Sequence, residues 1–373
     1  MKKVLFISNV LSHIEAFHLP YLQWFKDRGY EVHVLTNADG KAAPYCDKLF
    51  DVGIERSPFN PKNIAAIKKA KQIIDAENYD IIHSHTPMGG VTGRLAAVAA
   101  RKKGAKILYT AHGFHFYKGA AKINWLLYYT MEKFLAGKTD CIITINEEDY
   151  QRAKEKFSTK GTAIEKISGI GVKLERFTPV SAAEKTELKK QYGYDGKFCL
   201  IYAAEFIPRK NHRFFIQAAG ELCRRCPDVK FLFCGKGVLL EDMKKLASEL
   251  GVAQYIDFLG FRTDMPALYK MSDVLISASI EEGFGINIIE GMASGMPAVA
   301  SIVRGHKEMV RDGENGFLFD AASPAQFADH IIQLYNDPAL YSAFSSAAIK
   351  TAQRFSIENS LKQMENIYKN YEK

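Results

Sequence analysis

Short apolar runs alternate with longer amphipathic stretches in the first half of the chain. Residues 65–76 and 91–103 carry apolar positions at helical spacing, and they lie among the runs VLFIS, EVHVLT, DIIHSH, KILYTAH and CIITIN. Strands that alternate with helices predict a parallel sheet with helices on both faces. We therefore expect an α/β, doubly wound, Rossmann-like domain here.

The second half repeats this pattern with the runs FCLIYAAE, VKFLFCG, YIDFLG, VLISAS, PAVAS and GFLF. Glycines and Pro179 interrupt the pattern in KISGIGVKLERFTP, and the chain from about Pro338 reads as helix without a further strand. We predict one domain over residues 1–175 and a second over 176–354, with a helix at about 355–373 packing back on the first. Two such domains would face each other across a cleft, where ligands bind at the carboxyl ends of the strands.

Length and composition are those of a globular protein. The chain has 373 residues, of which 47% are hydrophobic and 25% charged. No apolar run approaches the roughly 20 residues that span a bilayer. The opening MKKVLFISNV imitates a signal peptide, but Ser8 and Asn9 interrupt it and no small-residue cleavage site follows. We interpret it as a first strand and expect a cytoplasmic protein.

Basic residues are concentrated in the first half. Residues 1–180 carry 27 Lys+Arg and 18 Asp+Glu, whereas residues 181–373 carry 23 and 24. A basic half attracts nucleic acid, an anionic membrane or a phosphorylated ligand. The basic residues are scattered and no aromatic-basic recognition motif accompanies them, so we expect no nucleic acid partner.

The sequence does not predict a metal site. Cys223 and Cys226 form a CxxC pair at the end of a predicted helix, without the second pair that a zinc site needs. His83 and His85 have ligand-like spacing, but no neighbouring carboxylate or cysteine completes a coordination shell. Structural, reduced cysteines and histidines that line or pack behind the cleft are the favoured interpretation.

Charged and small residues follow several predicted strands. His112 and Gly113 follow KILYTAH, Arg209 and Lys210 open the helix after FCLIYAAE, and Lys236 follows VKFLFCG. Two cations at a helix N-terminus, where unpaired N–H groups add a positive field, predict an anion site.

The segment EEGFGINIIEGMASGMP, at residues 281–297, gives this site a more specific chemistry. Gly283 and Gly285 allow a close backbone approach, and a helix starting near Ile286 would point N–H groups at a diphosphate. Glu282 precedes that helix and Glu290 lies on it, and carboxylates accept hydrogen bonds from sugar hydroxyls. Together these features predict a nucleotide-sugar site.

SASIEEGFGINIIEGMASGMPAVAS resembles the EGFG…E signature of the retaining GT-B glycosyltransferases of family GT4, with the E-x7-E spacing of that family. RGHKEMVRDGENGFLF is similar to the stretch that follows the signature. AFHLPYLQWFKDRGYEVHVLTN, YTAHGFHFYKGAAKINWLLYY and TDCIITINEEDYQRA resemble bacterial capsular and exopolysaccharide glycosyltransferases. The resemblance covers nearly the whole chain. It implies the GT-B fold, an acceptor-binding first domain and a nucleotide-sugar-binding second domain.

The resemblance also implies roles for individual residues. Catalysis would involve His112 beside the donor sugar, Lys210 at the diphosphate and Glu282 at the sugar hydroxyls. Glu290 would bind the ribose, and residues 260–264 would hold the base. The donor-binding set is Arg209, Lys210, Lys236, Arg262, Gly283, Phe284, Gly285, Ile286 and Glu290. Members of the family need neither a metal nor another cofactor, and the resemblance implies that this protein needs none.

The chain departs from the family pattern in two places. Many relatives carry a Gly-Arg pair after the first strand of the second domain, where this chain has Ala204 and Glu205. A glutamate does not stabilise a diphosphate, and Arg209 is the candidate to replace the missing charge. Relatives often carry a double glycine after the first strand, where this chain reads SNVLSHIEAFH, so we expect a reshaped acceptor side.

On the acceptor side the candidates are His18, His115, Lys118 and Lys122. The segment at residues 120–138 mixes aromatic, apolar and basic residues, among them Trp125 and Tyr128. It is either an interfacial helix that meets anionic lipid or a core helix with a basic rim. In the first case the acceptor would be a saccharide linked to polyprenyl diphosphate, and the protein would sit peripherally at the inner face of the cell membrane.

The favoured function is retaining transfer of a sugar, from UDP by the habit of the family, to this acceptor in capsule or exopolysaccharide biosynthesis. One alternative is a non-hydrolysing UDP-sugar epimerase, which would need no acceptor. Another is a non-catalytic sugar-nucleotide-binding partner, which Glu205 favours and Lys210, Glu282 and Glu290 oppose.

Overall fold

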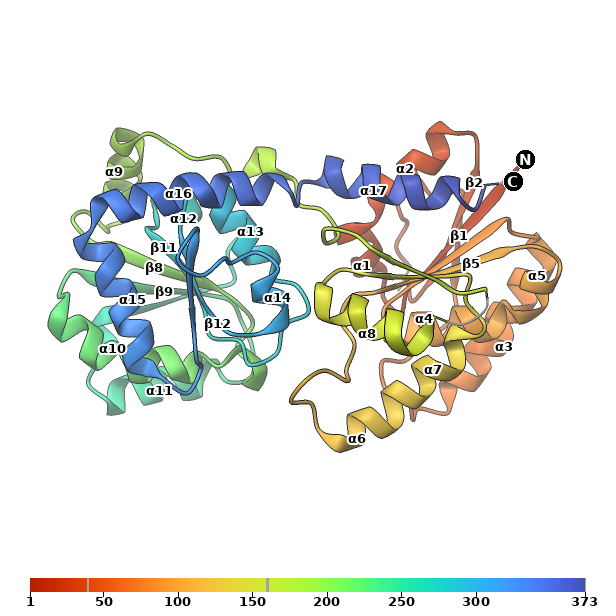
Figure 1. The fold of residues 1–373 in the computed structure, drawn as a ribbon, viewed down its shortest axis with the longest axis horizontal. Coiled ribbons are helices and arrows are strands. Elements are labelled where there is room, and N and C mark those ends of the chain that lie inside the picture. Colours follow the sequence, from red (N-terminus) through yellow and green to blue (C-terminus); the bar gives the residue numbers. More distant parts are fainter. Residues whose placement is uncertain (39, 159–160, 373) are drawn as a thin grey trace. The chain divides into compact units, whose positions relative to one another are not determined.

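The computed structural model describes residues 1–38, 40–158 and 161–372. The chain forms two compact units (Figure 1). The first unit comprises Met1–Gly171 and Ile357–Lys373, and the second comprises Val172–Ser356. The chain therefore leaves the first unit at Gly171 and returns to it at Ile357.

The first unit is built on a seven-stranded parallel sheet with the strand order β3-β2-β1-β4-β5-β6-β7. Its strands are β1 Lys3–Ile7, β2 Glu31–Thr36, β3 Lys48–Asp51, β4 Ile81–His85, β5 Lys106–Ala111, β6 Cys141–Thr144 and β7 Ala163–Lys166. β4 is buried at every position because helices cover both faces of the sheet (Figure 1). The carboxyl ends of β4 and β5 bring His85 and the segment from His112 to one edge.

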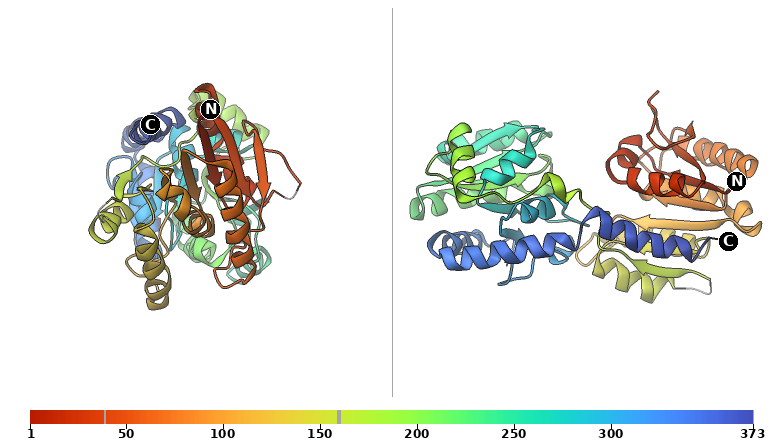
Figure 2. Two further views of the ribbon diagram at one scale, coloured as in Figure 1. Left: turned by 90° about the vertical axis from the view of Figure 1, so that its right-hand side faces the viewer. Right: turned by 90° about the horizontal axis from the view of Figure 1, so that it is seen from above.

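The helices of the first unit are α1 Leu11–Phe17, α2 Leu19–Asp27, α3 Lys62–Glu77, α4 Pro87–Ala96, α5 Val98–Lys102, α6 Lys122–Asn124, α7 Thr130–Ala136, α8 Glu147–Phe157 and α17 Ile357–Lys369. A π-helical turn, η1 (Trp125–Tyr129), joins α6 to α7. The C-terminal α17 lies beside α2 (Figures 1 and 2). There Arg28 pairs with Glu365 at 2.7 Å, and the Tyr368 hydroxyl lies 2.8 Å from His83 Nδ1.

The second unit has a six-stranded parallel sheet with the order β10-β9-β8-β11-β12-β13. Its strands are β8 Phe198–Ala203, β9 Val229–Cys234, β10 Ile256–Gly260, β11 Val274–Ser277, β12 Ala298–Ser301 and β13 Gly316–Phe319. Its helices are α9 Ala182–Gln191, α10 His212–Arg225, α11 Leu240–Glu249, α12 Met265–Met271, α13 Ile286–Ala293, α14 Arg304–Lys307, α15 Pro324–Asn336 and α16 Pro338–Gln353, with 3₁₀ turns η2 Leu174–Arg176, η3 Pro208–Lys210 and η4 Ala253–Tyr255. This strand order places the ends of β8 and β11 side by side.

Gly171 marks the point where the chain leaves the first unit. Its φ of +85° lies in the left-handed region, and a Cβ atom there would come within 2.7 Å of the Ile357 Cα atom. Only glycine meets both conditions without strain. The two chain segments that bound the first unit can therefore pass in close contact.

Candidate functional site

The EGFG loop, residues 282–285, lies between β11 and α13 in the second unit. Gly285 is the N-cap residue of α13, and its carbonyl accepts the Ile288 N–H at 3.0 Å. Because glycine has no side chain, the N-cap residue cannot cap the first N–H groups of the helix. The N-terminal end of α13 therefore offers N–H donors and a positive field to an anion.

The η3 turn, which carries Lys210, is held beside this loop by two hydrogen bonds to its backbone carbonyls. The Ile280 N–H donates to the Arg209 carbonyl at 2.9 Å, and the Tyr202 hydroxyl donates to the Lys210 carbonyl at 2.8 Å. The Lys210 ammonium group pairs with the Glu282 carboxylate, and both side chains are 14% exposed. The structure thus brings together two of the three residues predicted to be catalytic.

Arg209 reaches the same carboxylate. Its Nη1 lies 3.8 Å from Glu282 Oε2, whereas Glu205 is exposed beyond the end of β8. Arg209 and Lys210 therefore both contact Glu282, beyond the end of β8, where many relatives carry the arginine that this chain lacks. This arrangement supports Arg209 as the replacement for that charge.

Glu290 lies in α13 and is held by a tyrosine. The Tyr269 hydroxyl donates to Glu290 Oε2 at 3.3 Å. Burial raises the pKa of the Glu290 carboxyl to about 7, although the Tyr269 hydrogen bond and Arg176 act in the opposite direction. A half-buried carboxyl that has few partners is an acceptor ready for ligand hydroxyls.

Gly305, the second residue of α14, packs against the backbone of the EGFG loop. Its N–H donates to the Glu282 carbonyl at 3.0 Å, and a Cβ atom there would lie 2.7 Å from that oxygen and 2.8 Å from the Phe284 nitrogen. The neighbouring His306 is buried between the Ser277 hydroxyl and the Ser301 carbonyl, at 3.1 and 2.8 Å. The position of Glu282 therefore depends on residues that follow β12.

The remaining predicted donor residues lie on neighbouring loops of the second unit. Lys236 lies 5.5 Å above the ring of Phe261, which is 70% exposed. Arg262 makes a bidentate ion pair with Asp264: Nε donates to Oδ1 at 2.8 Å and Nη2 to Oδ2 at 2.6 Å. Phe284 is buried and packs on the ring of Phe355 at 5.6 Å. Arg262 is thus neutralised, and Phe261 offers an exposed aromatic face.

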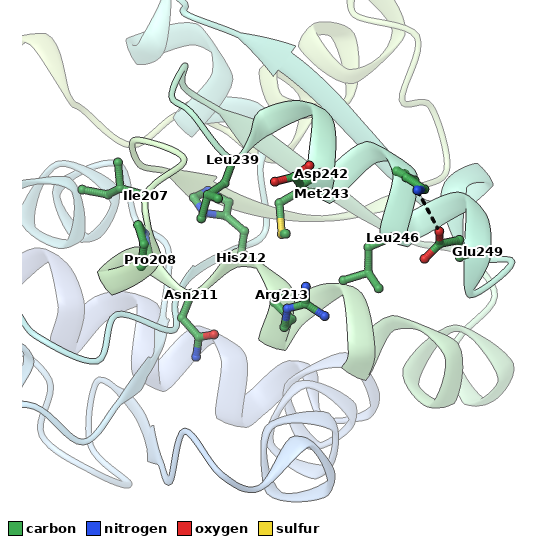
Figure 3. Close-up of a pocket in the computed structure, with 11 residues that line it drawn as sticks. Ile207, Pro208, Asn211, His212, Arg213, Leu239, Asp242, Met243, Leu246 and Glu249 are labelled. Atoms are coloured by element: carbon green, nitrogen blue, oxygen red, sulfur yellow. Dashed lines mark ion pairs between the residues drawn. The ribbon is translucent and has the colours of Figure 1, made fainter.

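A separate pocket of about 480 Å³ lies between α10 and α11 (Figure 3). Its lining includes Ile207, Pro208, His212, Asp242 and Glu249, of which only His212 is buried. Neither Lys210, Glu282 nor Glu290 lines this pocket. It is therefore distinct from the predicted donor residues.

The third predicted catalytic residue, His112, lies in the first unit and belongs to a cluster of five histidines. This histidine cluster consists of His13, His18, His83, His85 and His112. The Nε2 atoms of His13 and His112 are 3.2 Å apart, and the rings of His18 and His85 stack at 3.7 Å. Burial lowers the pKa of His13 to about 4 and that of His112 well below its usual range, so both are neutral at pH 7.

Two members of the histidine cluster lack hydrogen bonds. His18 and His85 are 2% and 1% exposed, and all four of their ring nitrogens have no hydrogen-bond partner among the described residues. A buried polar atom without a partner costs about 1–3 kcal/mol. His18, predicted on the acceptor side, is thus buried in the cluster.

A pocket of about 620 Å³ lies next to the cluster in the first unit. We call it the first-unit pocket; its lining includes the polar residues Asn9, His13, Arg56, Thr86, His115 and Glu132 and the apolar residues Phe59, Met88, Val91, Leu127 and Met131. Glu132 is fixed by a two-point ion pair with the buried Arg94, at 2.7 and 2.9 Å. A mostly apolar pocket with a few fixed polar groups is typical of a ligand site.

The predicted amphipathic segment forms a continuous helical run from α6 through η1 to α7. Its outer face exposes Ile123, Leu126, Leu127, Met131 and Phe134, and Lys118, Lys122 and Lys133 are exposed near it. Within the described part of the chain, no helix is both long and apolar enough to cross a membrane. An exposed apolar face with basic neighbours fits an interfacial helix.

Trp125 and Tyr128 do not belong to that outer face. The Trp125 ring lies 5.7 Å from the buried Phe116, and Tyr128 stacks on His115 at 4.7 Å. Both rings pack inward against the domain on one side and stay partly exposed on the other, so their contact with lipid stays a prediction. The segment has a core face and an exposed face at once.

Several residues of the site were not predicted from the sequence. Tyr269, Gly305 and Arg94 act through partners far along the chain, and no local pattern marks them. His13 lies in a helix and carries no such mark either, although three histidines of the cluster follow or end predicted strands. The shared position of these histidines at strand ends was the sequence feature that could have indicated the cluster.

The chain matches two protein families. Residues 184–351 match the family described as glycosyl transferases group 1, and residues 3–146 match glycosyl transferase 4-like. EpsD of Bacillus subtilis (strain 168), a glycosyltransferase by name, is 47% identical over 371 residues, which cover 99% of this chain and 97% of EpsD. The UDP-Gal:alpha-D-GlcNAc-diphosphoundecaprenol alpha-1,3-galactosyltransferase of Escherichia coli is 27% identical over 97% of this chain and 95% of its own.

Solved structures share the fold. HepE of Anabaena in complex with UDP superposes with a TM-score of 0.79 at 22% identity, covering 99% of this chain and all of HepE. Sucrose-phosphate synthase of Thermosynechococcus elongatus gives a TM-score of 0.80 at 18% identity over 99% of both chains. The chain therefore belongs to the GT4-like glycosyltransferases, with the two parallel-sheet α/β domains of the GT-B fold.

Proposed function

We propose that this glycosyltransferase moves a sugar from UDP to a saccharide carried on polyprenyl diphosphate, with retention of the anomeric configuration, in capsule or exopolysaccharide biosynthesis. The observation that carries the proposal is the Lys210–Glu282 ion pair beside the N-terminal end of α13, with Glu290 in the same helix. A positive helix end, a cation and two acids are the groups that a diphosphate and sugar hydroxyls require.

The donor would be bound without a metal ion. Lys210, Arg209 and the first N–H groups of α13 supply positive charge from three directions, which is the role that a divalent cation plays elsewhere. Glu290 would accept hydrogen bonds from the ribose, and Glu282 would pass from Lys210 to the hydroxyls of the sugar. Phe261 offers an exposed ring for the base.

Transfer would proceed on one face of the sugar. The bond between the anomeric carbon and the diphosphate oxygen breaks, and its electron pair goes to the diphosphate. The acceptor hydroxyl oxygen forms the new bond to the anomeric carbon, and its proton goes to the leaving phosphate oxygen. Lys210 and the α13 N–H groups stabilise the charge that develops on that oxygen, so their contribution is largest in the transition state. His112 would contact the donor sugar.

Two comparisons support the choice of substrates. The Escherichia coli relative is named for a UDP-galactose donor and a diphosphoundecaprenol-linked acceptor, and HepE was solved with UDP. The first-unit pocket, with its apolar walls beside His115, suits a saccharide whose carrier is a lipid. Lys118 and Lys122 are exposed and basic, as contacts to the phosphates of such a carrier would be.

The helical run from α6 to α7 would hold the protein peripherally at an anionic membrane. Its exposed Leu126 and Phe134 would enter the interface, while Lys122 and Lys133 would meet anionic headgroups. A lipid-linked acceptor remains in its membrane, so contact with the membrane would bring the transferase to its substrate.

A transfer assay tests the proposal. Purified protein is incubated with radiolabelled UDP-galactose, UDP-glucose or UDP-N-acetylglucosamine, with and without an undecaprenyl-diphosphate-linked saccharide. We expect label in the lipid fraction only with the acceptor, and an α-linkage by NMR. Proton exchange at a sugar carbon without an acceptor would instead indicate an epimerase. Tight UDP binding without turnover of any donor and acceptor pair would favour the non-catalytic partner.

A further inference from the structure

Two polar residues of the first-unit pocket come from the ends of neighbouring strands. Asn9 follows β1, Thr86 follows β4, and both line the pocket. β1 pairs with β4 in the sheet, and the Asn9 N–H donates to Thr86 Oγ1 at 3.2 Å. The two strand ends therefore give the pocket a polar side, in contrast to the apolar residues that line the rest of it.

Thr86 is held in a backbone conformation that threonine rarely adopts. Its φ and ψ angles are +63° and 154°, in a region that is occupied almost only by glycine. Strained residues of this kind are concentrated at ligand sites. Gly89 packs close by, because a Cβ atom there would lie 2.8 Å from Thr86 Oγ1 and 2.9 Å from the Ser8 Cα atom. The start of α4 is thus packed tightly on the end of β1, which fixes the threonine in place.

The Thr86 hydroxyl is left with one hydrogen-bonding function. Its Oγ1 accepts the Asn9 N–H at 3.2 Å and the Gly89 N–H at 3.3 Å. A hydroxyl has two acceptor lone pairs and one donor O–H, so both lone pairs are occupied. Within the described part of the chain, no group accepts the O–H. Thr86 can therefore only donate to a ligand in the pocket, and a ligand oxygen that carries no proton is its complementary partner.

Asn9 offers a second unused donor. It is 7% exposed and lines the pocket, yet its side-chain amide makes no hydrogen bond to any residue that the structure describes. Buried polar groups in proteins are nearly always hydrogen-bonded, so an amide without a protein partner indicates a water molecule or a ligand. The amide NH2 donates as the Thr86 hydroxyl does. The two residues thus form a donor pair that the protein itself does not use.

The charges that line the pocket favour an anion. Arg56 lines it and pairs with no acid in residues 1–38, 40–158 and 161–372. Glu132, the acidic residue of the lining, is neutralised by its bidentate ion pair with Arg94. Lys118 and Lys122, which the sequence indicates as acceptor contacts, are not among the lining residues. A net positive lining beside two neutral donors suits the oxygens of a phosphate group.

We propose that Asn9 and Thr86, together with Arg56, bind the diphosphate of the lipid-linked acceptor. This inference rests on the proposed function and names the part of the acceptor that the polar side of the pocket holds. Leu127 and Met131 line the same pocket and belong to the exposed face of the α6–α7 run. They would accompany the polyprenyl chain from the bound diphosphate toward the membrane.

The test uses farnesyl diphosphate, a soluble isoprenoid diphosphate, and farnesol, which lacks the phosphates. Both are titrated by calorimetry into the full chain in saturating UDP, so that the donor site is occupied. We expect the wild type to bind farnesyl diphosphate more tightly than farnesol. Asn9→Ala and Thr86→Gly should each weaken binding of farnesyl diphosphate by about 10- to 100-fold, as for a lost hydrogen bond to a charged group, and leave farnesol binding unchanged.

Two further variants make the test specific. Thr86→Ser keeps the hydroxyl and should restore the affinity for farnesyl diphosphate that Thr86→Gly loses. Asn370→Ala, exposed beyond α17, is the matched control for Asn9→Ala. Glycine adopts the conformation of Thr86 without strain, and the Asn9 amide has no protein partner to lose, so we expect both main variants to fold.

Wild-type affinity for farnesyl diphosphate in Asn9→Ala and Thr86→Gly would overturn the proposal. So would an equal loss of farnesol binding, or a wild type that does not bind farnesyl diphosphate. Sugar transfer to a lipid-linked saccharide is measured on the same samples. Transfer that continues in both variants with an unchanged KM for the acceptor would contradict the phosphate subsite alone. Phosphate-dependent binding without any transfer by the wild type would contradict the proposed function and leave the subsite in place.

Discussion

The Lys210 ammonium group pairs with the Glu282 carboxylate, and the Arg209 guanidinium lies 3.8 Å from the same carboxylate. One acid therefore contacts the two cations that a donor diphosphate needs. A diphosphate carries more charge than Glu282 and would displace it from Lys210, which would free the carboxylate for the sugar. This exchange links binding of the phosphates to placement of the sugar.

Replacing Lys210 with alanine should mainly lower turnover. The charge on the diphosphate oxygen grows as the bond to the sugar breaks, so we expect kcat to fall about 100- to 1000-fold, as for loss of one oxyanion donor. The Kd for UDP should change by less, because Arg209 and α13 still meet the phosphates. Steady-state kinetics and calorimetry measure both. Lys350→Ala is the control, because Lys350 is exposed on α16. A wild-type kcat in Lys210→Ala would show that Lys210 does not stabilise the transition state.

Glu290→Gln should stabilise the protein at high pH. The folded protein keeps the Glu290 proton up to about pH 7, whereas the usual pKa is 4.5. Between these values the folded state binds the extra proton, so the free energy of unfolding of the wild type falls as the pH rises and stays lower above pH 7. Glutamine does not titrate. We expect the variant to gain on the order of 2 kcal/mol relative to the wild type between pH 5 and pH 8.

Urea denaturation at pH 5 and pH 8 measures this difference for both proteins. If the stability of the variant relative to the wild type does not change between the two pH values, Glu290 is not the buried acid described above. Loss of UDP binding alongside the gain in stability would indicate a residue kept for function at a cost in stability.

Gly305→Ala should weaken nucleotide binding although it removes no functional group. The added methyl group would collide with backbone atoms of Glu282, Gly283 and Phe284 at 2.7 to 2.8 Å, and backbone atoms yield less readily than side chains. Overpacking of this kind costs about 1–3 kcal/mol, or roughly 5- to 100-fold in Kd if the loop shifts. Gly220→Ala, in α10, creates only an ordinary contact at 3.6 Å and is the control. Equal UDP affinity in both variants would show that the loop does not need this support.

The exposed face of the α6–α7 run should drive membrane binding. We expect Leu126→Ser with Phe134→Ser to reduce binding to vesicles that contain phosphatidylglycerol by about tenfold or more, since each buried side chain contributes about 1.5–3 kcal/mol. The control replaces two exposed apolar residues elsewhere, Ile64→Ser with Val238→Ser. Co-sedimentation with vesicles measures all three proteins. The interfacial role is excluded if the two double variants bind alike.

Much of the fold follows from the sequence because its central strands are buried on both faces. All six strands of the second unit coincide with apolar runs, since parallel strands under two helical layers need continuous hydrophobic stretches. β3 (KLFD) and β7 (AIEK) were not predicted. They are edge strands with no fully buried position, so their sequences carry no apolar run.

Part of the candidate site was predictable because its residues follow the carboxyl ends of strands. Lys210 and Glu282 each stand just beyond a strand, and β8 and β11 are neighbours in the sheet, so their ends meet. Contacts made across the chain were not predictable. Tyr269 meets Glu290 from another helix, and Gly305 meets the EGFG loop from the far side of β12. Such pairings depend on packing, which a single sequence does not record.

The most direct test of the central claim is a calorimetric titration with UDP, GDP and ADP, in EDTA and then with magnesium. We predict that UDP binds in EDTA, that magnesium changes its Kd little, and that Glu290→Ala loses the binding while remaining folded by circular dichroism. This result would support a metal-independent uridine nucleotide site built on Lys210 and Glu290. If none of the three binds, or if Glu290→Ala binds UDP as the wild type does, the donor site proposed here is contradicted.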